Sequence, residues 1–140
     1  MKKVANKSIW MTGNDFLLDT NIVSGWLKGE VSIAKNIAGA NNVYIPVIVI
    51  GELYYGALYA TQTRKNISDI QRISLICNVL AIDESTAFHY GEIKCALRKI
   101  GKPIPENDIW IAAIALQHSL TIVTRDKHFN EIQAISIKRW

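Results

Sequence analysis

The chain has 140 residues, which suits one domain with a hydrophobic core, and 49% of its residues are hydrophobic. This composition excludes an intrinsically disordered chain, and no apolar run reaches the roughly 18 residues that a membrane-spanning helix needs. The formal charge of +4 is weak support for nucleic-acid binding, because three of the 16 basic residues, Lys2, Lys3 and Lys7, lie in the first ten positions.

The first residues and the two cysteines indicate the compartment. Residues 1–14 lack an apolar stretch long enough for a secretion signal, and we treat them as an N-terminal extension before one domain at residues 15–140. Cys77 and Cys95 lack paired spacing, which argues against a zinc site and against a disulfide framework. We therefore expect a soluble cytoplasmic protein.

The first apolar run, residues 16–18, stops on Asp19 and is followed by helical spacing as far as Gly29. This pattern predicts a buried parallel strand and then a short helix. A second helix over residues 32–40 and a second strand over residues 43–45 follow. Ligands of α/β sheets bind beyond the carboxyl ends of strands, so Asp19 is a candidate site residue, although an Asp there is often only a helix cap.

Residues 47–58 could extend the second strand, because they begin with β-branched residues. Their length and the preceding Pro46 favour a helix instead. On a helix, Glu52 shares a face with Val49 and Leu53 and is the one acid on that apolar face. Glu52 then belongs either to a buried site or to the border of the face, where its carboxylate reaches water.

The middle of the chain continues the alternation of helices and strands. Residues 64–77 predict a helix, residues 79–82 a strand, and residues 86–100 a helix that Ser85 can cap and Gly101 ends. The end of this last helix carries a basic cluster of Lys94, Arg98, Lys99 and Lys102. Such a cluster usually lies in solvent and complements the helix dipole, and the alternative is a nucleic-acid surface.

The next helix is apolar on every side from Ile109 to Leu116, which predicts that it runs through the core. Asp108 lies in its first turn, where the free N–H groups and the helix dipole favour a carboxylate. Asn107 could cap the helix instead and leave Asp108 free for another role.

Residues 120–124 predict a further buried strand, which Asp126 follows, and residues 134–140 predict an edge strand. Strands that alternate with helices define an α/β fold whose central sheet of about five strands is mostly parallel. In such a sheet Asp19, Asp108 and Asp126 converge on one edge.

Close carboxylates cannot all stay ionised unless cations offset their repulsion, so the acids imply a metal. We expect all-oxygen ligands with no His or Cys nearby, which points to Mg²⁺ or Mn²⁺. A metal held in this way can activate water for in-line attack on phosphorus, so the predicted reaction is phosphodiester hydrolysis.

Four motifs in this order carry a family resemblance: Leu18-Asp19-Thr20-Asn21, Ile50-Gly51-Glu52-Leu53 with Tyr55-Gly56, Pro105-Glu106-Asn107-Asp108 with Ile111-Ala112-Ala113, and Thr124-Arg125-Asp126 with Phe129. On these motifs the sequence resembles the PIN-domain ribonucleases, specifically the VapC-type toxins of bacterial toxin–antitoxin pairs. The resemblance implies a three-layer α/β/α PIN-like domain, Mg²⁺ or Mn²⁺ as cofactor without a nucleotide, and RNA cleavage that leaves a 3′-hydroxyl and a 5′-phosphate. It also implies a homodimer, a VapB-like antitoxin partner and no membrane partner.

Carried over residue by residue, the resemblance makes four acids both metal ligands and catalytic residues: Asp19, Glu52, Asp108 and Asp126. Asn21 and Thr124 become secondary contacts. Glu106 is left out, because it precedes the Asn107-Asp108 pair and is expected to point to solvent. The stretch before Asp19 is longer than such proteins usually carry.

Two other functions remain as alternatives. In an aspartyl-phosphate phosphatase Asp19 would be the nucleophile, but the acid expected two residues later is replaced by Asn21. The other alternative is a catalytically inactive module that binds RNA or an antitoxin.

The remaining polar and aromatic residues are assigned by spacing. The histidines are isolated and are treated as structural or surface residues: His89, His118 and His128. Four aromatics are assigned to the core or a dimer interface in preference to base stacking: Trp26, Tyr54, Tyr55 and Trp110. The candidates for RNA backbone contact are Arg98, Lys99, Lys102, Arg125 and Lys127.

Overall fold

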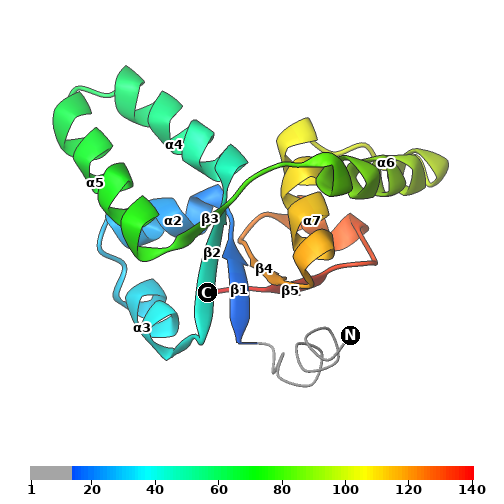
Figure 1. The fold of residues 1–140 in the computed structure, drawn as a ribbon, viewed down its shortest axis with the longest axis horizontal. Helices are drawn as coiled ribbons and strands as arrows, with labels where there is room; N and C mark the ends of the chain where they lie inside the picture. The colour runs from blue at the N-terminus through cyan, green and yellow to red at the C-terminus, as the bar shows by residue number, and fades with distance from the viewer. Residues whose placement is uncertain (1–13) are drawn as a thin grey trace.

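A five-stranded sheet with the order β3-β2-β1-β4-β5 forms the centre of the computed structural model, which describes residues 14–140 (Figure 1). Every neighbouring pair of strands is parallel. The strands are β1 (Asp15–Leu18), β2 (Asn42–Pro46), β3 (Asn78–Leu80), β4 (Thr121–Val123) and β5 (Ser136–Lys138). The predicted α/β class with a parallel sheet of five strands is confirmed.

Six α-helices and one 3₁₀ helix connect the strands: α2 (Thr20–Leu27), α3 (Val31–Gly39), α4 (Val47–Tyr59), α5 (Thr63–Ile76), α6 (Glu84–Lys99), α7 (Glu106–His118) and η1 (Lys127–Glu131). The chain moves from β1 through β2 to β3 in one direction across the sheet and then returns to β4 and β5 on the other side of β1. Because such crossovers are right-handed, α2 to α5 cover one face of the sheet and α6 and α7 cover the other. Figure 1 shows the resulting three layers.

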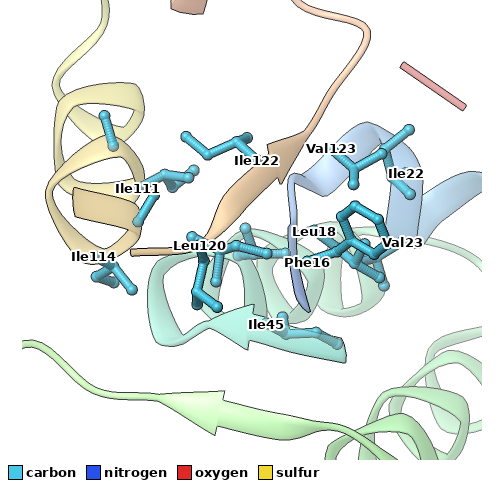
Figure 2. Packing of buried hydrophobic residues seen from close by; sticks show 14 of the residues in the cluster. Phe16, Leu18, Ile22, Val23, Ile45, Ile111, Ile114, Leu120, Ile122 and Val123 are labelled. Atoms are coloured by element: carbon cyan, nitrogen blue, oxygen red, sulfur yellow. The ribbon is translucent and has the colours of Figure 1, made fainter. Parts of the chain in front are cut away.

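The core lies on both faces of the central strands. Ile111 of α7 and Ile122 of β4 are fully buried on one face, and Ile22 and Val23 of α2 are fully buried on the other (Figure 2). The predicted passage of α7 through the core is confirmed, since five consecutive residues from Ile111 to Ala115 are buried. Burying each large aliphatic side chain contributes about 1.5–3 kcal/mol to folding.

The segment after β2 is the helix α4 and not an extension of the strand, as predicted. Pro46 ends β2 and is also the N-cap of α4, because its fixed φ and missing N–H suit the start of a helix. Val49 and Leu53 are buried on the core side of α4, and Glu52 between them is partly buried. Glu52 therefore lies at the border of the apolar face.

Two predicted helix caps are wrong. Asp83, and not Ser85, caps α6, because its carboxylate accepts a hydrogen bond from the backbone N–H of Thr86 at 3.0 Å while Thr86 bonds back to the cap. This reciprocal capping box satisfies two N–H groups, which a lone Ser cannot do. Helix α7 begins after Pro105, so Asn107 lies inside the helix and does not cap it.

The topology places a crevice at the carboxyl ends of β1 and β4. The strand order reverses between these neighbours, and ligands of open α/β sheets bind at such a switch point. Asp19 follows β1 and Thr124 follows β4 at this edge. The predicted extension, residues 1–14, lies outside the described residues except for Asn14, and the boundary at residue 15 stays a prediction. Within residues 14–140, no helix is long and apolar enough to cross a membrane.

Candidate metal-dependent active site

Asp19 lies at the centre of the switch point and is 5% exposed. It caps α2 by accepting a hydrogen bond from the Thr20 N–H at 2.8 Å. Its second carboxylate oxygen accepts hydrogen bonds from Thr124 Oγ1 at 2.7 Å and from Asn21 Nδ2 at 3.2 Å. Burial raises the pKa of Asp19, and the hydrogen bond from Thr124 acts against that increase.

The turn after β4 is tied to Asp19 through Thr124. The Thr124 hydroxyl donates to Asp19 and accepts a hydrogen bond from the Asp126 N–H at 2.9 Å. Asn21 forms a second link, because its side-chain oxygen accepts a hydrogen bond from the Arg125 N–H at 3.2 Å. Asn21 and Thr124, predicted as secondary contacts, thus fix the backbone that presents Asp126.

Asp108, in the first turn of α7, faces this turn, and its side chain is 14% exposed. Burial, together with the negative charges of Asp19 and Asp126, raises the pKa of Asp108 to about 6. The hydrogen bond to His128 acts in the opposite direction. A carboxyl with so high a pKa marks a place where an additional positive charge would be favourable.

His128 lies beside two of the candidate acids, so the expectation that no His is nearby is wrong. Its Nδ1 is 3.0 Å from Asp108 Oδ2 and 3.0 Å from Asp126 Oδ1. The reason is the 3₁₀ helix η1, which Asp126 caps and which turns the chain back toward the start of α7. His128 is exposed, as a surface residue should be, but it also belongs to the site.

Glu52 approaches the site from α4. Its carboxylate accepts a hydrogen bond from Thr20 Oγ1 at 2.7 Å, and its negative charge contributes to the raised pKa of Asp19. Glu52 and Asn107, the neighbour of Asp108, line one open hollow between α4 and the start of α7.

The four predicted acids therefore form one electrostatic group. Asp108 and Asp126, with His128, offer one ligand atom each within 4.8 Å of one another. The charges of Asp126 and Glu52 both raise the pKa of Asp19, which connects the remaining two acids to this cluster.

Several other candidates lie elsewhere. Glu106, excluded from the site by its position, accepts a hydrogen bond from the Tyr90 hydroxyl at 2.7 Å and pairs with Lys94. Trp110 stacks on Tyr90 with ring centroids 4.1 Å apart. Tyr55 is 71% exposed, so it is not a core residue, and its assignment to a dimer interface stays a prediction.

Arg125, a candidate for RNA contact, forms an ion pair with Glu30 instead of extending into solvent. Sequence reasoning missed this pair and the contacts of Thr20 and His128. Only His128 gives a signal in the sequence, because it lies two residues after Asp126.

Comparison with known proteins agrees with this geometry. The family model of the PIN domain matches residues 16–135. Ribonuclease VapC2 of Haemophilus influenzae is 33% identical over 128 residues, an alignment that covers 89% of this chain and 97% of that protein. The tRNA(fMet)-specific endonuclease VapC of Shigella flexneri is 28% identical over 128 residues, with the same coverage.

Two solved structures extend the likeness to three dimensions. DNA-bound VapBC from Salmonella typhimurium has a TM-score of 0.85 at 29% identity, covering 90% of this chain and 98% of that one. VapBC-1 from nontypeable Haemophilus influenzae has a TM-score of 0.82 at 30% identity, with the same coverage. The parallel five-stranded sheet of this chain is thus the fold of the PIN domain. The chain belongs to the PIN-domain family and, within it, to the VapC-type toxins.

Proposed function

We propose that this chain is a metal-dependent endoribonuclease that hydrolyses RNA phosphodiester bonds. The acids that carry the reaction in this proposal are Asp19, Glu52, Asp108 and Asp126. One observation supports it above the others: Asp19 and Asp108 are carboxyls with raised pKa values, held close to a third acid at the sheet's switch point. The names of the relatives, a ribonuclease and an endonuclease, support the same activity.

The donor set fits a divalent cation. One carboxylate oxygen of Asp108, one of Asp126 and a ring nitrogen of His128 lie within 4.8 Å of one another. Asp19 Oδ1 accepts one hydrogen bond, from Thr20, and so keeps a lone pair for a ligand. A cation would offset the repulsion and burial that raise the pKa of Asp108. Carboxylate oxygens favour Mg²⁺ or Mn²⁺ among the available metals.

The protein's own groups position the acids for this role. A metal of this kind supplies a water of lowered pKa and neutralises charge on the phosphate. Thr124 and Asn21 orient the carboxylate of Asp19, and Thr20 orients that of Glu52. His128 holds Asp108 and Asp126 at equal distances from one ring nitrogen.

Cleavage assays with the purified chain test this proposal. Total bacterial RNA and initiator tRNA are the first substrates to use, since the Shigella flexneri relative is a tRNA(fMet)-specific endonuclease. We expect discrete cuts with new 5′-phosphate ends from the wild-type chain with Mg²⁺ or Mn²⁺, and none after chelation or in Asp108→Asn. Glu84→Gln, an exposed change on α6, should cut like the wild type. Equal cutting by Asp108→Asn and the wild type would contradict the proposal.

The proposed partners follow from the same comparisons. Similar structures from Salmonella typhimurium and Haemophilus influenzae are VapBC proteins, which supports a VapB-like antitoxin as the partner that neutralises this chain. Co-purification with the product of an adjacent reading frame, and loss of RNA cleavage in that complex, would test the partner. The homodimer and the cytoplasmic location stay predictions.

A further inference from the structure

Arg125 lies between Thr124 and Asp126 in the sequence, but its side chain contacts residues outside the site. Its Nη1 and Nη2 donate to the two carboxylate oxygens of Glu30 at 3.1 and 2.6 Å, and its Nε donates to the backbone oxygen of Trp140 at 3.0 Å. A two-point contact between a planar guanidinium and a carboxylate fixes direction as well as distance. The guanidinium of Arg125 is thereby held in one orientation.

The backbone of Arg125 is held from both sides as well. Its N–H donates to Asn21, and its carbonyl oxygen accepts a hydrogen bond from Arg139 Nη1 at 3.1 Å. The preceding Thr124 N–H donates to the carbonyl of Lys138, the last residue of β5, at 3.0 Å. The turn that presents Asp126 is therefore attached to α2, to the segment before α3 and to the strand beyond β4.

The fold leaves space for Glu30 at this place. Gly25 of α2 is buried, and a Cβ on it would lie 2.7 Å from Glu30 Oε1 and 2.7 Å from the Cδ1 of Ile33. The Glu30 N–H also donates to the Gly25 carbonyl at 3.0 Å. The guanidinium of Arg125 lowers the pKa of Glu30, so the carboxylate stays charged at neutral pH.

We propose that Arg125 is a positioning residue, which Glu30 and the Trp140 carbonyl hold so that Thr124 and Asp126 stay aimed at Asp19. This inference rests on the proposed metal site, and it extends the support of that site to Glu30, which is none of the candidate ligands. Both partners of the ion pair are more than one-third exposed, so the pair adds little to global stability. Its effect should appear in the geometry of the turn.

A different role for Arg125 would be contact with an RNA phosphate, as its position in the sequence suggests. The two roles respond differently to Arg125→Lys. A lysine keeps the positive charge that attracts phosphate, but it cannot form the two-point contact with Glu30 and lacks the Nε bond to Trp140. Glu30→Gln removes the negative charge that pairs with Arg125. Because a carboxylate does not bind phosphate, this change should not weaken a phosphate contact.

The test uses four variants of the full chain: Arg125→Lys, Glu30→Gln, the double variant, and Arg72→Lys as the matched control. Arg72 pairs with Asp69 on α5, which carries none of the candidate acids. Hydrogen exchange of the amides of residues 124–126, without metal, should be several-fold faster in the first three variants and unchanged in the control. Titration with Mn²⁺, followed by electron paramagnetic resonance, should show affinity reduced by roughly tenfold, the usual effect of losing an outer-shell partner.

Non-additivity provides the decisive comparison. If Glu30 acts through Arg125, the double variant binds Mn²⁺ no more weakly than Arg125→Lys alone. Unchanged exchange and unchanged Mn²⁺ affinity in the single variants would overturn the positioning role. A wild-type chain that binds no Mn²⁺ would instead overturn the proposed metal site, while the exchange rates would still decide the role of Arg125. In a further variant, Arg125→Gln, which removes the charge, weaker RNA binding with a smaller salt dependence at constant Mn²⁺ affinity would assign Arg125 to phosphate contact.

Discussion

Replacing Asp108 by Asn should stabilise the metal-free protein at neutral pH. The Asp108 carboxyl has a pKa of about 6, against an ordinary value of 3.8, because it is buried near Asp19 and Asp126. That difference corresponds to about 3 kcal/mol by which the ionised group opposes folding above pH 6. The amide keeps most of the shape but loses the charged contact with His128, so we expect a net gain of about 1–3 kcal/mol in the free energy of unfolding.

The stability difference between Asp108→Asn and the wild type should depend on pH. Above pH 6 the carboxylate is charged in both the folded and the unfolded chain, and the full destabilisation is present. As the pH falls from 6 toward 4, the folded protein takes up its proton first, so the wild type gains stability and the advantage of Asp108→Asn disappears. Mg²⁺ or Mn²⁺ should reverse the order at pH 7.5, because a ligand that binds only the folded wild type stabilises it.

Urea unfolding at pH 7.5 and pH 5, with a chelator and then with Mn²⁺, measures these differences. Asp69→Asn is the matched control, since Lys65 and Arg72 lower the pKa of Asp69 and the loss of its charge should weaken the fold slightly at both pH values. A metal-free Asp108→Asn variant that is no more stable than the wild type at pH 7.5 would refute the electrostatic reasoning. An advantage that persists unchanged at pH 5 would refute it equally.

Three further predictions concern single side chains. Thr124→Val removes the hydroxyl that lowers the pKa of Asp19, so the protein should lose about 1–3 kcal/mol of stability and bind Mn²⁺ more weakly, as calorimetry can measure. Ile111→Ala should cost about 2–5 kcal/mol in urea unfolding, because the side chain is fully buried, and should leave Mn²⁺ affinity unchanged. Gly25→Ala should destabilise the fold by about 1–3 kcal/mol, because the new methyl group meets the Glu30 carboxylate; an unchanged midpoint would show that Glu30 moves freely.

Sequence reasoning predicts the sheet well, because local patterns determine where its elements begin and end. Pro46 separates β2 from α4, and the apolar residues of α7 predict its burial. It also predicts that Asp19 and Asp108 approach each other, since acids at strand and helix ends of a parallel sheet share one edge. The side chains between the elements are less predictable. The capping of α6 by Asp83 depends on a reciprocal contact with Thr86, which the prediction of Ser85 as the cap did not consider.

Contacts between residues distant in the sequence are the part that local patterns do not contain. Arg125 meets Glu30 across 95 positions, and no spacing rule distinguishes that partner from an RNA phosphate. His128 joins the acids because η1 turns the chain back toward α7, a turn that depends on tertiary packing of Phe129. For the same reason the sequence does not show that Tyr55 lies outside the core, since the side of α4 that faces the core depends on its neighbours.

The hydrogen bond from Thr124 to Asp19 joins residues 105 positions apart, and this separation has a consequence for synthesis. A ribosome adds about 5–20 residues per second, so roughly 5–20 s pass between the addition of Asp19 and that of Asp126. Strand β1 cannot form its hydrogen bonds with β4 during that interval, because β4 has not yet been synthesised. The acids therefore come together only after Asp126 has been added, and a nascent chain that stops before β4 cannot assemble them.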